Sequence, residues 1–104
     1  MNRDNMMRQE LFAFSKKLQA FDGVYVKPDT YFDRLIVGSV GQHPYVLIAR
    51  VKFYEEYSDE PFDGWSVWYR PGGTKRSKYY LGTTENLGNL FSLCLDRIGI
   101  KSRH

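Results

Sequence analysis

The chain has 104 residues with a formal net charge of +3, and 42% of them are hydrophobic and 16% aromatic. This length allows one domain with one core, so we expect a single domain over residues 1–104 and exclude a second. The aromatic content predicts a packed globule and excludes a disordered chain. The small basic excess favours an acidic partner without deciding its kind.

Cysteine use and hydropathy bear on the compartment. Cys94 is the only cysteine, so no intramolecular disulfide can form and we expect a cytoplasmic protein. The first residues lack the apolar stretch of a signal peptide, and no apolar run approaches the length of a membrane span. We therefore expect an intracellular protein with no membrane partner.

The first third of the chain predicts a helix followed by two strands. Apolar residues recur at spacings of four and three between residues 5 and 21, which predicts an amphipathic helix. Residues 24–27 form a strand candidate that stops at Pro28, and this proline predicts a place at the edge of a sheet. Residues 33–40 form a second strand, and the turn residues 41–44 connect it to the next strand as a hairpin.

Residues 45–54 alternate with the period of a strand. We expect the odd-numbered side, from Tyr45 to Phe53, to face the core. The even-numbered side ends in Arg50 and Lys52, which this assignment places on the face away from the core.

An acidic segment follows this strand. Its carboxylates are Glu55, Glu56, Asp59, Glu60 and Asp63, and Pro61 and Gly64 break regular structure there. The segment lacks the residue spacing of a calcium loop, so we expect no metal. It is either a solvated loop, or a surface that docks on a basic protein or mimics the charge of a nucleic acid.

Residues 65–82 predict a β-hairpin around the turn Pro71-Gly72-Gly73. No Asp or Glu occurs from Trp65 to Thr84, and basic residues gather near the turn. We expect Trp65, Val67 and Leu81 to face the core, and the opposite face to join the basic end of the preceding strand. The predicted nucleic-acid or partner site consists of Arg50, Lys52, Trp68, Arg70, Lys75, Arg76, Lys78 and Tyr80. The alternative is that a helix or a second copy of the chain covers Trp68 and Tyr80, and that the basic residues only solubilise the turn.

A second amphipathic helix is predicted from Glu85 to Ile98, with Thr83 or Thr84 as its cap and Gly99 at its end. Cys94 lies on the apolar side of this helix, where burial would make the thiol unreactive. The only histidines, His43 and His104, have no triad partner in the sequence pattern. We therefore expect no catalytic residues, no metal, no cofactor and no enzymatic activity.

The order of elements from Trp65 to Ile98 is strand, basic turn, strand ending in Leu81-Gly82, and helix. In this order the segment resembles the three-stranded-sheet DNA-binding domains of the plant AP2 type and the arm-binding domains of tyrosine recombinases. The resemblance implies that a strand face enters the major groove of DNA, with Arg70, Lys78 and Trp68 contacting bases or backbone.

The sequence as a whole predicts an α+β fold, with an antiparallel sheet of about four or five strands and the N-terminal and C-terminal helices packed on one face. The predicted function is non-enzymatic binding of nucleic acid, DNA or RNA, through the basic and aromatic hairpin face. The alternative is a small regulator or inhibitor of the kind that phages and other mobile elements use, which docks on a host protein such as a nuclease or a defence complex. The sequence leaves open whether the chain forms a homodimer.

Overall fold

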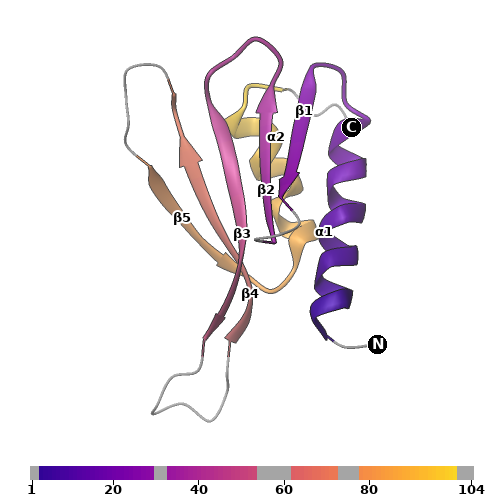
Figure 1. The fold of residues 1–104 in the computed structure, drawn as a ribbon. Coiled ribbons are helices and arrows are strands. Elements are labelled where there is room, and N and C mark those ends of the chain that lie inside the picture. The colour runs from indigo at the N-terminus through magenta and orange to yellow at the C-terminus, as the bar shows by residue number, and fades with distance from the viewer. Residues whose placement is uncertain (1–2, 30–32, 54–61, 73–77, 101–104) are drawn as a thin grey trace.

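A computed structural model of the chain describes residues 3–29, 33–53, 62–72 and 78–100. The chain forms a helix, five strands, a short 3-10 helix and a last helix (Figure 1). In order these are α1 (Arg3–Gln19), β1 (Val24–Asp29), β2 (Arg34–Ser39), β3 (Tyr45–Phe53), β4 (Phe62–Arg70), β5 (Tyr79–Thr84), η1 (Leu87–Leu90) and α2 (Phe91–Arg97).

The five strands form one antiparallel sheet in the order β1-β2-β3-β4-β5, so each strand pairs with the strand that follows it in the chain. Such a meander needs only short connections between neighbouring strands. The expected α+β class and the antiparallel sheet with two terminal helices are confirmed. β1 lies at an edge of the sheet, as Pro28 predicted.

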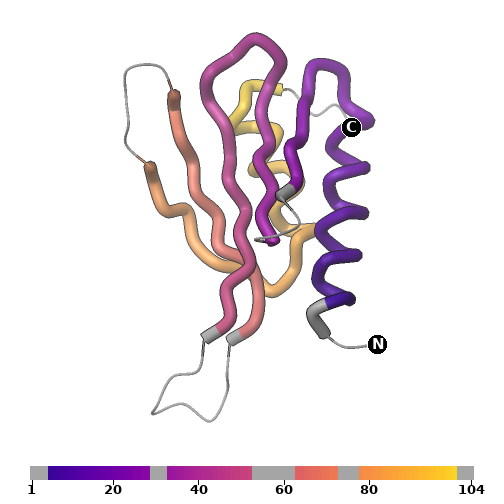
Figure 2. Tube along the Cα trace, in the orientation of Figure 1, coloured from indigo at the N-terminus to yellow at the C-terminus, as the bar shows by residue number. Residues whose placement is uncertain are grey.

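Both helices lie on the same side of the sheet (Figure 1). The apolar stripe of α1 and the apolar side of η1 and α2 pack on one face of the strands, as their spacing predicted. Figure 2 shows the same arrangement as a trace, and Ile100, the last described residue, lies close to Gly23 in the turn between α1 and β1. The buried apolar residues are Met7, Leu11, Phe14, Leu18, Leu35, Val37, Val46, Ile48, Trp65, Val67, Leu87, Leu90, Cys94, Leu95 and Ile98.

The expected facing of β3 is wrong. Val46 and Ile48 are fully buried, whereas Tyr45 and Leu47 are only partly buried. The register explains this result, because Ile48 pairs with the buried Leu35 of β2 and cross-strand partners share a face of the sheet. Both sides of this strand begin with apolar residues, so alternation alone did not identify the core side.

In the hairpin of β4 and β5, the side chains expected to face the core do so. Trp65 and Val67 are buried, and Leu81 packs against the core. One irregularity interrupts the pairing at Leu81, because Val67 pairs with Gly82 while Trp68 pairs with Tyr80. This β-bulge lies at the edge of the sheet, where bulges are common.

The second helical segment begins later than predicted. Asn86, and neither Thr83 nor Thr84, caps it: its Oδ1 accepts a hydrogen bond of 2.9 Å from the backbone N–H of Gly88. The hydroxyl of Thr84 instead accepts one of 3.1 Å from the N–H of Asn86. Asparagine and glycine are weak helix formers, so the first turn is 3-10 and the α-helix starts only at Phe91.

The end of α2 and the state of Cys94 agree with the sequence. Gly99 has a φ of 82°, a left-handed conformation that glycine adopts readily at the end of a helix. Cys94 is fully buried, and this burial raises the pKa of its thiol to about 12. No helix among the described residues is long and apolar enough to cross a membrane.

Candidate binding face of the sheet

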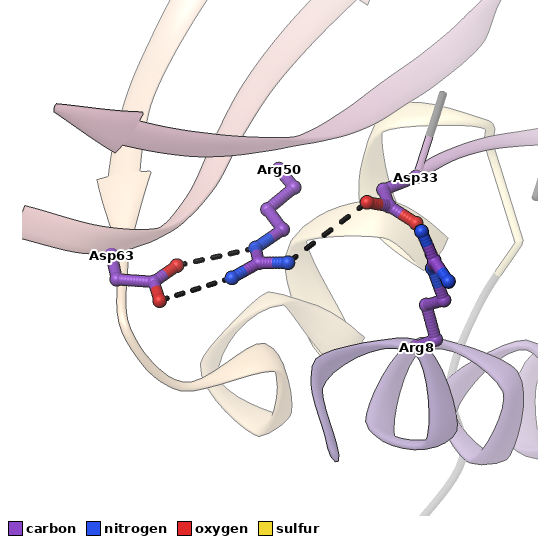
Figure 3. Close-up of polar contacts among 4 residues, drawn as sticks. All are labelled: Arg8, Asp33, Arg50 and Asp63. Atoms are coloured by element: carbon purple, nitrogen blue, oxygen red, sulfur yellow. Dashed lines mark hydrogen bonds and ion pairs between the residues drawn. The ribbon is translucent and has the colours of Figure 1, made fainter. Parts of the chain in front are cut away.

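Arg50 belongs to a charge network on the helix-covered side of the sheet (Figure 3). Its guanidinium group donates two hydrogen bonds to the carboxylate of Asp63, from Nε at 3.2 Å and from Nη2 at 3.1 Å. It also lies 4.0 Å from the carboxylate of Asp33, which in turn accepts a hydrogen bond of 2.8 Å from Nε of Arg8. The network therefore connects α1, β3 and β4 with Asp33, the residue that precedes β2.

The side chains of this charge network are largely buried, which limits the ligands that Arg50 can contact. The side chains of Arg50, Asp63 and Asp33 are 9%, 13% and 17% exposed. A nearly buried arginine in a bidentate ion pair cannot at the same time contact a phosphate on the opposite face of the sheet. The expectation that Arg50 joins the basic hairpin face is wrong, and Asp63 is an ion-pair partner within the fold.

The remaining predicted residues fall into three groups: one residue on the same side of the sheet as Arg50, several on the other side, and several outside the described residues. Lys52 is exposed, but strand alternation places it on the same side of β3 as Arg50. Lys75 and Arg76 of the predicted basic turn lie outside the described residues. The acidic residues Glu55, Glu56, Asp59 and Glu60 also lie outside them.

On the side of the sheet away from the helices, cross-strand register arranges the residues in three rows. We call this side the open face, because no described helix packs on it. The first row is Tyr25, Gly38, Tyr45 and Arg70; the second is Lys27, Ile36, Leu47, Trp68 and Tyr80; the third is Asp29, Arg34, Ala49, Ser66 and Thr83.

An aromatic cluster occupies the β4–β5 end of the open face. The rings of Trp68 and Tyr80 lie 4.8 Å apart between centroids, with their planes 53° apart. The ammonium group of Lys78 lies 4.4 Å from the centroid of the Trp68 ring, a cation–π distance. Trp68, Arg70, Lys78 and Tyr80 therefore come together on one face, as the sequence predicted.

Hydrogen bonds fix the orientation of Trp68. Its Nε1–H donates to the hydroxyl oxygen of Ser66 at 3.3 Å, and this hydroxyl donates to the carbonyl of Ala49 at 3.1 Å. The polar group of the indole is thus satisfied within the sheet, while Tyr80 beside it remains 54% exposed. This arrangement presents a fixed aromatic surface to solvent.

A shallow trough of about 300 Å³ lies in the middle of the open face. Ile36 and Leu47, which pair across β2 and β3, form its apolar centre. Tyr45 and four basic side chains surround this centre, namely Lys27, Arg34, Arg70 and Lys78. Below, "the trough" refers to these seven residues.

Tyr25 owes its position to a glycine on the neighbouring strand. A Cβ atom at Gly38 would lie 2.5 Å from both Cζ and Oη of Tyr25, which is closer than a Cβ atom approaches any non-bonded atom. Only a residue without a side chain therefore lets the Tyr25 ring lie across β2. Tyr25 and Tyr45 stand on either side of this glycine in the first row.

Sequence reasoning missed half of this face. Lys27, Arg34, Tyr25 and Tyr45 were not assigned to it, although the alternation of Val24 and Val26 with Tyr25 and Lys27 was a usable signal. Four basic residues lie on the open face, namely Lys27, Arg34, Arg70 and Lys78. At its β1 edge the backbone register places Asp29 opposite Arg34.

Other kinds of site have little support within the described segments. No group of three or more His, Cys, Asp or Glu residues there could hold a metal ion. His43 is exposed and packs against the backbone at Gly72, and Cys94 is a buried thiol. Neither protein-family models, nor the sequences of curated proteins, nor solved structures give a match to this chain.

Proposed function

We propose that the chain is a non-enzymatic protein that binds single-stranded nucleic acid across the open face. The observation that carries this proposal is the combination of an aromatic cluster and four basic side chains on the uncovered side of one sheet. Basic grooves that follow the phosphate backbone, together with rings on which bases stack, are the usual means of binding single strands. Exposed bases offer flat surfaces to the rings, and phosphates offer charge to the lysines and arginines.

The width of the face favours a single strand over a duplex. Five strands at a spacing of about 4.8 Å extend about 19 Å from β1 to β5, whereas the major groove of DNA is about 12 Å wide and admits a two-stranded ribbon. The open face is therefore wider than the element that one groove admits, with Lys27 on its first strand and Lys78 beside its last. A flexible single strand that crosses the sheet along the rows could contact both.

The aromatic cluster would provide the stacking contacts. Because Nε1 of Trp68 already donates to Ser66, a base that covers this ring does not leave the indole N–H without an acceptor. Stacking of one base on an aromatic side chain contributes about 1–3 kcal/mol and depends little on base identity. We therefore expect affinity for single strands with a weak sequence preference.

The test is a titration of a labelled oligonucleotide of about 12 nucleotides at several salt concentrations, a length within the site sizes of single-strand binders. Each phosphate contact contributes about −0.7 to the slope of log K against log salt concentration, so four contacts predict about −2.8. Replacing Lys27 and Arg70 together by glutamine should reduce the slope to about −1.4. The matched control replaces the exposed Lys16 and Lys17 on α1, on the other side of the sheet, and should leave the slope unchanged.

Two results would contradict the proposal. One is an absence of saturable binding at low salt. The other is an equal loss of affinity in the control and in the open-face variant, because this would mean that only net charge matters.

The protein-docking alternative has weaker support. Of the five acids that suggested it, only Asp63 lies among the described residues, and its carboxylate binds Arg50. A host protein recovered in stoichiometric amount from a nuclease-treated lysate, together with no binding to any oligonucleotide, would favour this alternative.

A further inference from the structure

We infer that the trough is a subsite for one nucleotide, with the base over Ile36 and Leu47 and the phosphate at the surrounding cations. The inference rests on the proposed function and names the unit of ligand that the open face recognises. The base would lie on Ile36 and Leu47 and not on the rings of Trp68 and Tyr80, whereas Arg70 and Lys78 adjoin both places.

The first argument is the apolar centre of the trough. Ile36 and Leu47 are direct cross-strand neighbours, and both are only partly buried although they are aliphatic. They lie in the second row between Lys27 and Trp68. A flat group placed over them would remove apolar surface from water, which is favourable in proportion to the area covered. Tyr45, one row away, provides an aromatic wall.

The second argument is the position of the charges. Lys27 lies on the β1 side of the apolar centre, while Arg70 and Lys78 lie on the opposite side, near the turn between β4 and β5. Arg70 pairs in register with Tyr45, and the Lys78 ammonium extends over the Trp68 ring. A phosphate on either side of a bound base would therefore meet a cation, and arginine can donate two hydrogen bonds to it.

Size and chemistry together favour a nucleotide. The trough volume of about 300 Å³ is at the small end of ligand sites. Inorganic phosphate would use the cations but leave the apolar centre uncovered, and a nucleoside would do the reverse. A nucleotide uses both, so it should bind more tightly than either part.

The test measures how adenosine 5′-monophosphate, adenosine and inorganic phosphate displace the labelled oligonucleotide. We expect the nucleotide to displace it at a concentration at least about tenfold lower than the nucleoside or phosphate requires, since one charge-assisted hydrogen bond alone accounts for about this factor. Leu47→Thr, which introduces a β-branched residue that suits a strand, should weaken nucleotide binding about fivefold through lost apolar area. Thr83→Val changes the same face outside the trough and should have no effect.

A second variant keeps the inference testable if Leu47→Thr does not fold. Arg70→Gln alters an exposed side chain and should reduce the advantage of nucleotide over nucleoside, while the affinity for the nucleoside stays the same. An unchanged advantage would overturn the assignment of Arg70 to the phosphate.

The outcomes separate the two proposals. If the oligonucleotide binds but the nucleotide displaces it no better than phosphate does, the subsite inference fails and the proposed function stands. A second outcome is that the nucleotide binds and Leu47→Thr weakens this binding, while oligonucleotides bind no more tightly than the nucleotide. In that case the subsite stands and the proposed function fails. If neither ligand binds at low salt, both fail.

Discussion

Replacement of Arg50 by methionine should lower stability and leave nucleic-acid binding intact. The change keeps most of the apolar stem but removes the cation that pairs with Asp63 and approaches Asp33. Breaking a buried ion pair by removing one partner costs about 3–5 kcal/mol, because a charge is left in a poorly solvated site. Arg8 still contacts Asp33, and the side chains keep some exposure, so we expect the lower end, about 3 kcal/mol.

The magnitude can be checked by thermal unfolding. For a chain of this size each 1 kcal/mol lowers the melting temperature by about 4–5 °C, so the expected shift is about 12–15 °C. Lys52→Met is the matched control, since Lys52 is an exposed cation on the same strand and its loss should change stability by less than about 0.5 kcal/mol. Binding is then measured well below the lower melting temperature.

Two results would refute this reasoning. An unchanged melting temperature for Arg50→Met would mean that the ion pairs contribute nothing net. A loss of oligonucleotide affinity in a variant that remains folded would restore Arg50 to the binding site and contradict its position on the helix-covered side.

Three further predictions concern single positions. Gly38→Ala should displace the Tyr25 ring and therefore weaken oligonucleotide binding. It should also reduce stability by about 1 kcal/mol in denaturant unfolding, although alanine suits a strand better than glycine where there is space for its methyl group. Asn86→Ala removes the side-chain acceptor for the N–H of Gly88 and should cost about 1 kcal/mol in the same assay. Burial raises the pKa of Cys94 to about 12, above its ordinary value of 9.0, so the unfolded chain loses this proton at lower pH than the folded chain. The stability that the buried thiol contributes should be complete below pH 9.0 and should decline as the pH rises toward about 12. The measurement is the difference in unfolding free energy between the unaltered chain and Cys94→Ala, which should shrink over this pH range.

The sequence predicted the elements and most of the core because these depend on local patterns. The stripe from Met7 to Leu18 has helical spacing and is buried, and Pro28 marks the edge strand. The late start of the second helix was missed because two asparagines and a glycine follow Glu85, and Asn86 makes a hydrogen bond outside the helical pattern.

The binding face was harder to predict because it depends on which strands pair and in which register. Lys27 and Arg34 are far in sequence from Arg70, and only the sheet order brings them around Ile36 and Leu47. No local pattern contains this information. The hairpin residues Trp68 and Tyr80 could be placed together because they are separated by a single turn.

Arg50 and Arg70 show why the facing of a strand decides the role of a charged residue. Each lies on one of two paired central strands, and composition alone treats them alike. Arg50 pairs in register with the buried Trp65, so it points to the core side and must be neutralised there by carboxylates. Arg70 pairs with Tyr45 on the open face, where it remains hydrated and exposed. A shift of one residue along a strand exchanges these two environments, so stability and binding should depend on different arginines. Arg50→Met should change the melting temperature, and Arg70→Gln should change the affinity for nucleic acid. If both substitutions changed the same property, the division of the sheet into a structural side and a binding side would be wrong.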